Sequence, residues 1–242
     1  MKLIKITILI LGVAVLSPTF LSCSRETPLT ASTFELNGQA TVQVYSATVK
    51  ASRNAIFVDG NPLSGSVFSL GGIFPATAYS AKVDPGTRQF LIKDTTATTT
   101  QVPITFNESL EGGKSYTIFT YDTTTSVKQK TVLNNIVIPT DTTCMLRFAN
   151  FIYRTTALPN VDVYSSRRGN TIVFSNVATN AVTDYIPYAA GKLDTLSIFA
   201  TGTITPVLVK IYVPSLVQTR SYTSVYTGSY LGTKVTSTFA NY

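Results

Sequence analysis

The sequence predicts an all-β protein built from two tandem β-sandwich domains, and three observations lead to this prediction. Tyr and Phe number 13 each and Thr recurs throughout, and these residue types fit the pleated, half-buried surface of a strand. Short runs that alternate apolar and polar residues recur roughly every 8 to 12 residues between turn sequences. After the N-terminal segment, no stretch keeps the apolar spacing of an amphipathic helix for several turns.

The first 22 residues have the pattern of a bacterial lipoprotein signal. Lys2 and Lys5 supply a positive start, an apolar run extends from Ile6 to Leu16, and Phe20-Leu21-Ser22-Cys23 forms a cleavage box. The apolar run is too short for a membrane-spanning helix, which needs roughly 20 apolar residues, and such segments are processing signals. We therefore expect residues 1–22 to be removed, Cys23 to carry the lipid, and residues 23–38 to form a linker.

Lipidation of Cys23 would make the membrane a partner of the chain. A cysteine that carries more than one acyl chain is held durably, at about 0.8 kcal/mol per buried methylene. The residue after it is Ser24, and an Asp at this position would be associated with retention in the inner membrane. We therefore expect a lipoprotein of the outer membrane in the cell envelope, on either its periplasmic or its cell-surface side.

Residues 39–140 contain the alternating runs of the first predicted domain. Turn chemistry separates these runs, as in Asp59-Gly60-Asn61-Pro62, Gly71-Gly72, Asp84-Pro85-Gly86 and Gly112-Gly113. The clearest strands are expected at residues 41–44, 55–58, 90–92 and 116–119. One face of each sheet is apolar and the other carries Thr and Ser, which is typical of a sandwich.

Residues 141–242 repeat the first half at a nearly fixed offset. An offset of 106 aligns Ser115-Tyr116-Thr117 with Ser221-Tyr222-Thr223 and Phe90 with Leu196. At the front of the repeat an offset of 104 pairs Val44 with Phe148. Self-similarity of this kind indicates two copies of one unit, which we place at residues 39–140 and 141–242.

Several turn-and-strand motifs carry a family resemblance. They are Arg147-Phe148-Ala149-Asn150, Pro159-Asn160-Val161-Asp162-Val163-Tyr164, Val83-Asp84-Pro85-Gly86-Thr87 and the run from Leu110 to Phe119. Together they resemble an uncharacterised bacterial family of domains of unknown function, which are secreted, often tandem, immunoglobulin-like β-sandwiches. The sequence departs from the family at Phe151–Thr156, where a Ser-Pro-Asp-Ala-Pro segment is usual. The resemblance implies an immunoglobulin-like fold and an extracytoplasmic location, and it implies no activity.

The inventory of reactive residues favours a protein without catalytic chemistry. The chain has no histidine, which excludes Ser-His-Asp and Cys-His mechanisms and every metal motif that contains histidine. Cys144 has no partner once Cys23 is lipidated, and its alternating surroundings predict a buried strand position. Asp59-Gly60-Asn61 and Asp122 could offer oxygen ligands to Ca²⁺, but plain turns explain them better. We expect no enzyme activity, no cofactor and no metal site.

The charge pattern argues against nucleic acid as a partner. The formal net charge is +7, and removal of Lys2 and Lys5 lowers it to +5. The basic residues are scattered, whereas nucleic-acid binding needs Lys and Arg gathered on one face with aromatic residues between them. The densest pair, Arg167-Arg168, precedes Gly169-Asn170 and predicts a solvated hairpin turn. A mildly basic surface remains compatible with an anionic membrane or an acidic polysaccharide.

The leading functional hypothesis is a non-enzymatic, lipid-anchored cell-envelope protein that presents its tandem domains for binding or assembly. One alternative is a fimbrial or adhesin-type subunit that exchanges residues 27–37 or 235–242 with a neighbour. Another is a glycan-binding accessory lipoprotein of a nutrient-uptake system. Tyrosines at equivalent repeat positions predict core packing or a tyrosine corner, namely Tyr79, Tyr116, Tyr185 and Tyr222. Five others are candidates for surface recognition of a protein or glycan: Tyr153, Tyr164, Tyr188, Tyr226 and Tyr230.

Overall fold

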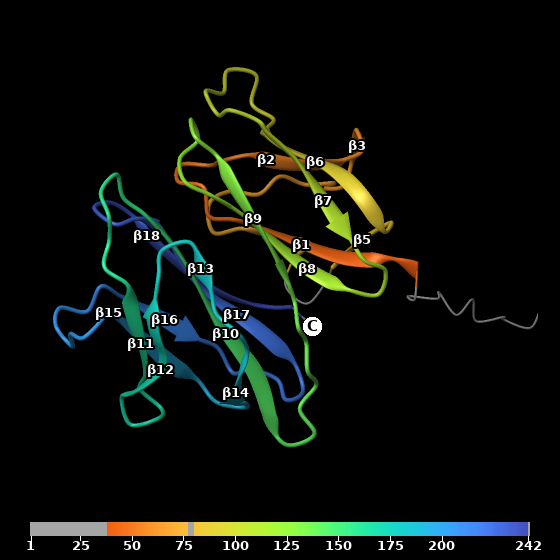
Figure 1. Cartoon of the computed structure of the whole chain (residues 1–242). Helices are drawn as coiled ribbons and strands as arrows, with labels where there is room; N and C mark the ends of the chain where they lie inside the picture. Colours follow the sequence, from red (N-terminus) through yellow and green to blue (C-terminus); the bar gives the residue numbers. More distant parts are fainter. Residues whose placement is uncertain (1–37, 77–79, 242) are drawn as a thin grey trace, which may run out of the picture. The chain divides into compact units, whose positions relative to one another are not determined.

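The computed structural model describes residues 38–76 and 80–241, and residues 36–242 form one compact unit (Figure 1). The predictions for the signal peptide, for Cys23, for the linker up to residue 37 and for Tyr79 lie outside the described residues. Within the described ranges, no helix is long and apolar enough to cross a membrane.

Residues 39–140, called domain 1 below, contain two sheets. The inner sheet of domain 1 has the order β4-β1-β8-β9, with β5 also paired to β1. Its strands are β1 (Ala40–Ser46), β4 (Ile73–Phe74), β5 (Ala81–Val83), β8 (Ser115–Tyr121) and β9 (Lys128–Leu133). The outer sheet has the order β3-β2-β6-β7, with β2 (Asn54–Val58), β3 (Asn61–Pro62), β6 (Gly86–Asp94) and β7 (Ile104–Leu110).

Residues 141–242, called domain 2, repeat this arrangement. The inner sheet of domain 2 has the order β13-β10-β17-β18, with β14 also paired to β10. Its strands are β10 (Thr143–Tyr153), β13 (Ala181–Val182), β14 (Ile186–Ala189), β17 (Ser221–Ser229) and β18 (Lys234–Ala240). The outer sheet has the order β12-β11-β15-β16, with β11 (Val161–Ser165), β12 (Thr171–Val177), β15 (Asp194–Ala200) and β16 (Val209–Val213).

The predicted fold class is confirmed, because each domain is a β-sandwich with the same topology. In both domains the first strand pairs in parallel with the strand that follows the outer sheet, β1 with β8 and β10 with β17. Val44 lies opposite Ile118, and Phe148, the counterpart of Val44 at the offset of 104, lies opposite Ser224. No described strand crosses residue 140.

Each sandwich has its own core between its inner and outer sheets. Alternate residues of the strands point into it, as the period of two requires. Domain 1 buries, among others, Val42, Val44, Ile56, Phe90, Ile92 and Ile118. Domain 2 buries, among others, Leu146, Phe148, Val163, Leu196, Ile198 and Ile211. Cys144 belongs to the second core and is fully buried, as its sequence context predicts.

Two of the repeat-equivalent tyrosines form tyrosine corners. The backbone N–H of Glu111 donates to the hydroxyl of Tyr116 at 3.0 Å, and the N–H of Val217 donates to the hydroxyl of Tyr222 at 3.0 Å. Both hydroxyls thus bind the chain five residues upstream. This confirms the predicted role of these positions, which is typical of immunoglobulin-like sandwiches.

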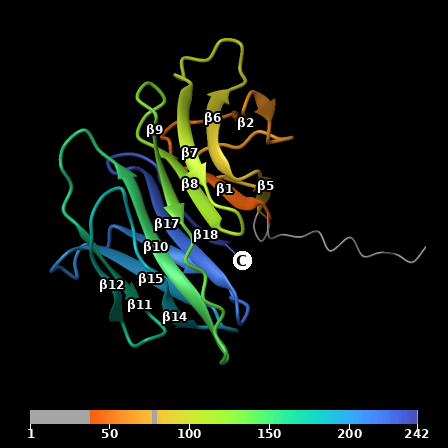
Figure 2. The ribbon, with the colours of Figure 1, turned by 45° about the vertical axis from the view of Figure 1, so that its right-hand side comes forward.

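The two inner sheets stack on each other, so each is buried on both faces. All but one residue of β1 and all but one of β17 are buried. The layer between them holds an apolar cluster that includes Tyr45, Phe119, Ala149, Phe151, Val225 and Phe239. Ring centroids of Tyr45 and Phe239 lie 5.4 Å apart, and those of Phe119 and Phe151 lie 4.7 Å apart. Figures 1 and 2 show the four sheets as successive layers, with the two inner sheets in the middle.

This stacking corrects the expectation that the Thr and Ser face of every sheet is a polar surface. In the inner sheets that face forms the contact between the domains, where Thr117 and Thr223 are fully buried. Apolar residues such as Tyr45 and Phe119 alternate with them on the same face. The inner strands are therefore covered on both faces although their sequences alternate apolar residues with Thr, Ser and Gln.

Arg147 is the centre of a polar network in this contact layer. Its side chain is 1% exposed, and its Nε donates to Thr223 Oγ1 at 2.8 Å. One terminal nitrogen donates across the domain boundary to Thr117 Oγ1 at 3.1 Å and to Asn134 Oδ1 at 2.7 Å. The guanidinium also stacks on Tyr185, 4.7 Å from the ring centroid.

The network has approximate two-fold symmetry, because repeat-equivalent residues face one another. Asn241 mirrors Asn134, and their N–H groups donate to Ser221 and Ser115 respectively at 2.7 Å. The Asn241 amide donates to Gln43 Oε1 at 3.0 Å, and the Gln43 amide donates to the carbonyl of Ala240 at 2.9 Å. Gln43 is the counterpart of Arg147 at the offset of 104. The domains therefore meet as the subunits of an isologous dimer do.

Candidate functional site

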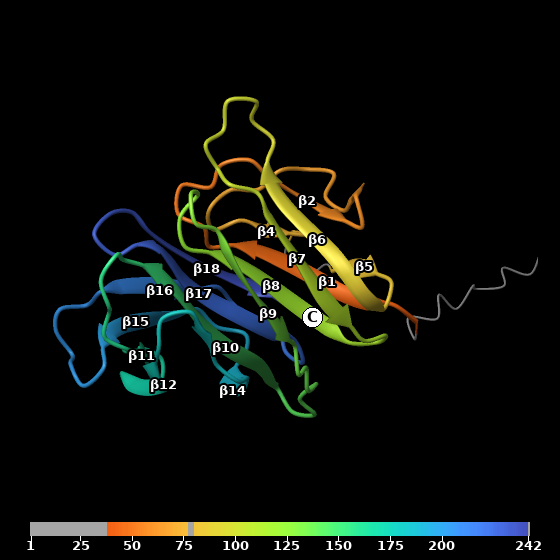
Figure 3. The same cartoon turned by 45° about the horizontal axis from the view of Figure 1, so that its top comes forward.

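The strand directions define two ends of the stacked domains. We call the end where β1, β8, β10 and β17 begin the near end, and the end where they finish the far end. The described chain starts at the near end, immediately before β1. Contacts across the stack align the two domains, since Gln43 binds Ala240 and the Thr227 hydroxyl donates to the carbonyl of Ala47 at 3.1 Å. Figure 3 shows β8, β17 and β18 running alongside one another.

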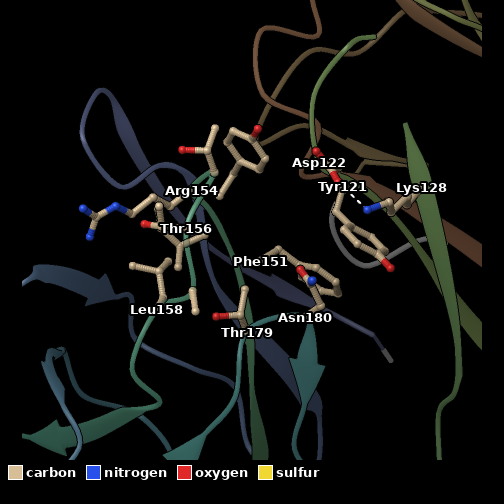
Figure 4. A pocket seen from close by; sticks show the side chains of 13 residues that line it. Tyr121, Asp122, Lys128, Phe151, Arg154, Thr156, Leu158, Thr179 and Asn180 are labelled. Carbon is tan, nitrogen blue, oxygen red and sulfur yellow. Dashed lines mark ion pairs between the residues drawn. The ribbon is translucent and has the colours of Figure 1, made fainter. Parts of the chain in front are cut away.

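A cleft of about 290 Å³ opens at the far end, with walls from both domains. Figure 4 shows Tyr121 and Phe151 inside it, with Asp122 and Lys128 at one edge and Arg154 at the other. Domain 1 supplies Tyr121, Asp122 and Lys128, and domain 2 supplies the run from Phe151 to Leu158 together with Thr179 and Asn180.

The wall from domain 1 is fixed by the turn between β8 and β9. Tyr121 ends β8, and its ring packs on Phe151 with centroids 5.4 Å apart. Asp122 has a φ of 76°, a conformation that Asp tolerates in turns, and its carboxylate accepts the N–H of Thr123 at 2.8 Å. Lys128 binds the same carboxylate at 2.7 Å. Its hydrogen bond to Asp122, followed by the charge of that group, raises the pKa of Lys128.

The wall from domain 2 is the end of β10 and the loop after it. This wall includes all of residues 151–156. Tyr153 is half-buried, and the Arg154 guanidinium lies 5.3 Å from the ring centroid of Tyr230. The carbonyl of Asn180 accepts a hydrogen bond from Lys130 Nζ of domain 1 at 2.9 Å, which ties the two walls together.

One polar atom that lines the cleft has no partner in the described part of the chain. The Oγ1 of Thr179 is buried and makes no hydrogen bond there. Buried hydroxyls are normally paired, so this one is an exception among the described residues. Aromatic rings beside hydroxyl, amide, carboxylate and cationic groups give the cleft both an apolar surface and directional polar contacts.

Acidic groups are few among the described residues that line the cleft. Asp122 is the one carboxylate among its described lining residues, and it is already paired with Lys128. Glycoside hydrolysis commonly needs two carboxylates on either side of the bond to be cleaved.

The five candidate tyrosines fall into three groups. Tyr153 lines the cleft, and Tyr230 lies behind it, where its N–H donates to the carbonyl of Tyr153 at 2.8 Å. Tyr164 is half-exposed on the outer sheet of domain 2, edge-on to Phe199 with centroids 5.2 Å apart. Tyr188 and Tyr226 are 2% and 0% exposed, so their assignment to the surface is wrong.

The two buried tyrosines have a physical reason to be inside. Tyr226 shares the core-facing side of β17 with Tyr222, four residues earlier, as the period of two requires. Tyr188 lies on β14, and its hydroxyl donates to the buried carboxylate of Asp194. The sequence analysis did not identify Tyr121 and Phe151 as residues of the cleft. Both lie on inner strands, and an aromatic residue among the Thr and Ser of such a strand could have indicated a covered face.

Asp194 lies away from the cleft, at the near end of domain 2, and both oxygens of its carboxylate accept hydrogen bonds. It is 7% exposed and accepts the hydroxyls of Ser165 and Tyr188 and the N–H groups of Arg167 and Thr195. Burial alone would raise the pKa of Asp194, but these hydrogen bonds outweigh it and hold the pKa below its usual value.

Burial raises the pKa of the Cys144 thiol to about 11, which leaves it protonated and unreactive.

The two acidic turns considered for Ca²⁺ are separate from each other. Asp59 pairs with Arg88 at 3.0 Å in domain 1, while Asp122 pairs with Lys128 at the far end. Across the described residues, no three His, Cys, Asp or Glu side chains gather in a group that could hold a metal ion.

Comparison with known proteins found similarity among solved structures. No protein-family model matches the sequence, and no curated protein matches it. Among solved structures, the chain is similar to CBMbc, a family CBM26 module of Amy13K from Eubacterium rectale that was crystallised with maltoheptaose. The identity is 11% and the TM-score is 0.27, over 82% of this chain and 96% of that chain. Similarity at this level carries no argument about the ligand.

Proposed function

We propose that this chain is a non-enzymatic, lipid-anchored protein of the outer membrane whose far-end cleft binds a short glycan. The observation that carries the proposal is the cleft itself, in which the partly exposed rings of Tyr121 and Tyr153 lie beside Thr179 and Asn180. Aromatic rings pack against the apolar faces of sugar rings, and hydroxyl and amide groups pair with sugar hydroxyls. At about 290 Å³, the cleft is at the lower limit of small-ligand sites, which suits a few sugar units.

The position of the cleft suits a protein held by its N-terminus. An anchor at Cys23 would join the described chain at residue 38, at the near end. The cleft lies at the other end of β1, a strand of seven residues that spans about 23 Å at roughly 3.3 Å per residue. A tether at Cys23 would therefore join the described chain at the end opposite to the cleft.

Strand exchange by the C-terminal segment receives less support. β18 is paired with β17 along its whole length, from Lys234 to Ala240. The next residue, Asn241, is 4% exposed and binds Gln43 and Thr117 of domain 1. Releasing this segment would therefore break both a ladder and the contact between the domains. The other candidate for exchange, residues 27–37, lies outside the described residues.

Removing the Tyr153 ring should weaken glycan binding about tenfold, the equivalent of about 1.4 kcal/mol, because its aromatic contact with the sugar is lost. The measurement is a glycan array with the chain from residue 24 onward, followed by titration of the strongest oligosaccharide against the wild type and Tyr153→Ala. Tyr164→Ala is the matched control, since Tyr164 is also half-exposed but lies away from the cleft. An array without binding, or equal losses in both variants, would refute the proposed site.

A further inference from the structure

We propose that the near end of domain 2 rests on an anionic lipid surface through a patch of exposed apolar residues flanked by cations. The near-end patch consists of Leu193, Tyr212 and Val217 with Arg167, Arg168 and Lys192. The inference rests on the proposed lipid anchor for its geometry, and its test uses a chain without any acyl group.

The apolar part of the patch is both exposed and contiguous. Leu193, Tyr212 and Val217 are 75%, 76% and 57% exposed. Leu193 and Tyr212 line one hollow together with Arg167. The N–H of Gly191 donates to the carbonyl of Leu216 at 2.8 Å, which brings the loop of Val217 beside the turn of Leu193. Single exposed apolar residues are ordinary, but a group of them marks an interaction surface.

The cations of the patch are held at the surface and have no ion pair within the described residues. Arg167 and Arg168 occupy the hairpin between β11 and β12, where each guanidinium donates to a backbone carbonyl, of Ala189 and Pro187 respectively. The two ion pairs of the described chain involve Arg88 and Lys128 instead. The nearby carboxylate of Asp194 is buried, and its oxygens are taken by its own hydrogen bonds. The exposed charge of the patch is therefore positive.

The location of the patch selects a lipid surface as its occupant. Thr41 at the start of β1 lines one hollow with Thr219 and Arg220, so the described chain begins beside the strands of domain 2. Fourteen residues separate Cys23 from Gly38, and they can span at most about 50 Å at roughly 3.6 Å each. An anchor at Cys23 would thus keep the near end within about 50 Å of the bilayer, which lets the near-end patch reach its headgroups. Cations that meet phosphate headgroups, with Leu and Tyr at the interface, are the usual composition of such a surface.

The test measures sedimentation of the non-acylated chain from residue 24 with lipid vesicles. This chain keeps every described strand, and residues 36–242 form a compact unit by themselves. We expect binding to vesicles of phosphatidylglycerol and phosphatidylethanolamine, little binding to phosphatidylcholine, and release by high salt. Leu193→Ser with Tyr212→Ser should weaken binding about tenfold, and Arg167→Gln with Arg168→Gln should weaken it similarly.

Leu231→Ser is the matched control, because Leu231 is 76% exposed but lies in the hairpin after β17 at the far end. Equal binding to anionic and neutral vesicles, or equal loss in the control, would overturn the proposal. So would a dimer in size exclusion that Leu193→Ser abolishes, since the patch would then bind a second copy. If Cys23 proves not to be acylated while vesicle binding persists, the proposal of a lipid anchor is refuted and the proposal that the near-end patch binds lipid is supported.

Discussion

Replacing Arg147 with alanine is expected to lower the free energy of unfolding by about 2–4 kcal/mol. The substitution removes three hydrogen bonds from a fully buried interface. It leaves Thr223 Oγ1 without its donor, whereas Thr117 and Asn134 each keep one other donor. A buried polar group that loses its partner costs about 1–3 kcal/mol. Two of the three bonds join domain 2 to domain 1. We therefore expect the contact between the two domains to be destabilised as well.

The measurement is urea denaturation at neutral pH, with Arg147→Gln as the conservative variant. Glutamine is the residue at the equivalent position of domain 1, Gln43, and its amide can still donate within the network. We expect the free energy of unfolding to fall by less than half as much in Arg147→Gln as in Arg147→Ala. Arg154→Ala at the exposed cleft edge is the control for loss of an arginine outside the layer. A change below about 0.5 kcal/mol for Arg147→Ala would show that the network does not hold the domains together.

Asp194→Asn is expected to lower the free energy of unfolding by about 2–4 kcal/mol at neutral pH. The amide cannot accept all four donors that surround the carboxylate, and hydrogen bonds to a charged group contribute about 1.5–3 kcal/mol each. The pKa of Asp194 is held below its usual value in the folded chain. A lowered pKa means that its contribution is present above the unfolded pKa, about 3.9, and is lost as the pH falls through the folded pKa.

The difference in free energy of unfolding between the wild type and Asp194→Asn should therefore become smaller when denaturation is repeated at pH values from about 7 down to about 2. Asp184→Asn is the control, because Asp184 is exposed and no described residue donates to its carboxylate. A gap that stays constant over this range would show that the ionised carboxylate is not the source of the stabilisation.

Much of the fold could be predicted from the sequence, because the strands and turns of a β-sandwich have recognisable local sequence patterns. The offset of 106 predicted that Tyr116 and Tyr222 are equivalent, and both form the same corner with the chain upstream. The alternation around Cys144 predicted its burial. These features depend on residues a few positions apart, which a pattern of period two can capture.

The stacking of the inner sheets was not accessible in the same way. Alternation shows that Gln43, Tyr45 and Thr117 share a face with their neighbours, but it does not show what covers that face. The sequence analysis noted only Thr and Ser on this face, whereas Tyr45 and Phe119 on the same face indicate a partner surface. The cleft was missed for the same reason, since Tyr121 and Phe151 meet only after the domains stack.

Intact-mass analysis of the protein extracted from bacterial membranes tests the premise shared by the orientation of the cleft and that of the near-end patch. We predict a chain that begins at Cys23, with the mass of residues 23–242 plus a diacylglyceryl group and an N-acyl chain. A mass without acyl groups, or one that still includes residues 1–22, would contradict the lipid anchor on which both orientations depend.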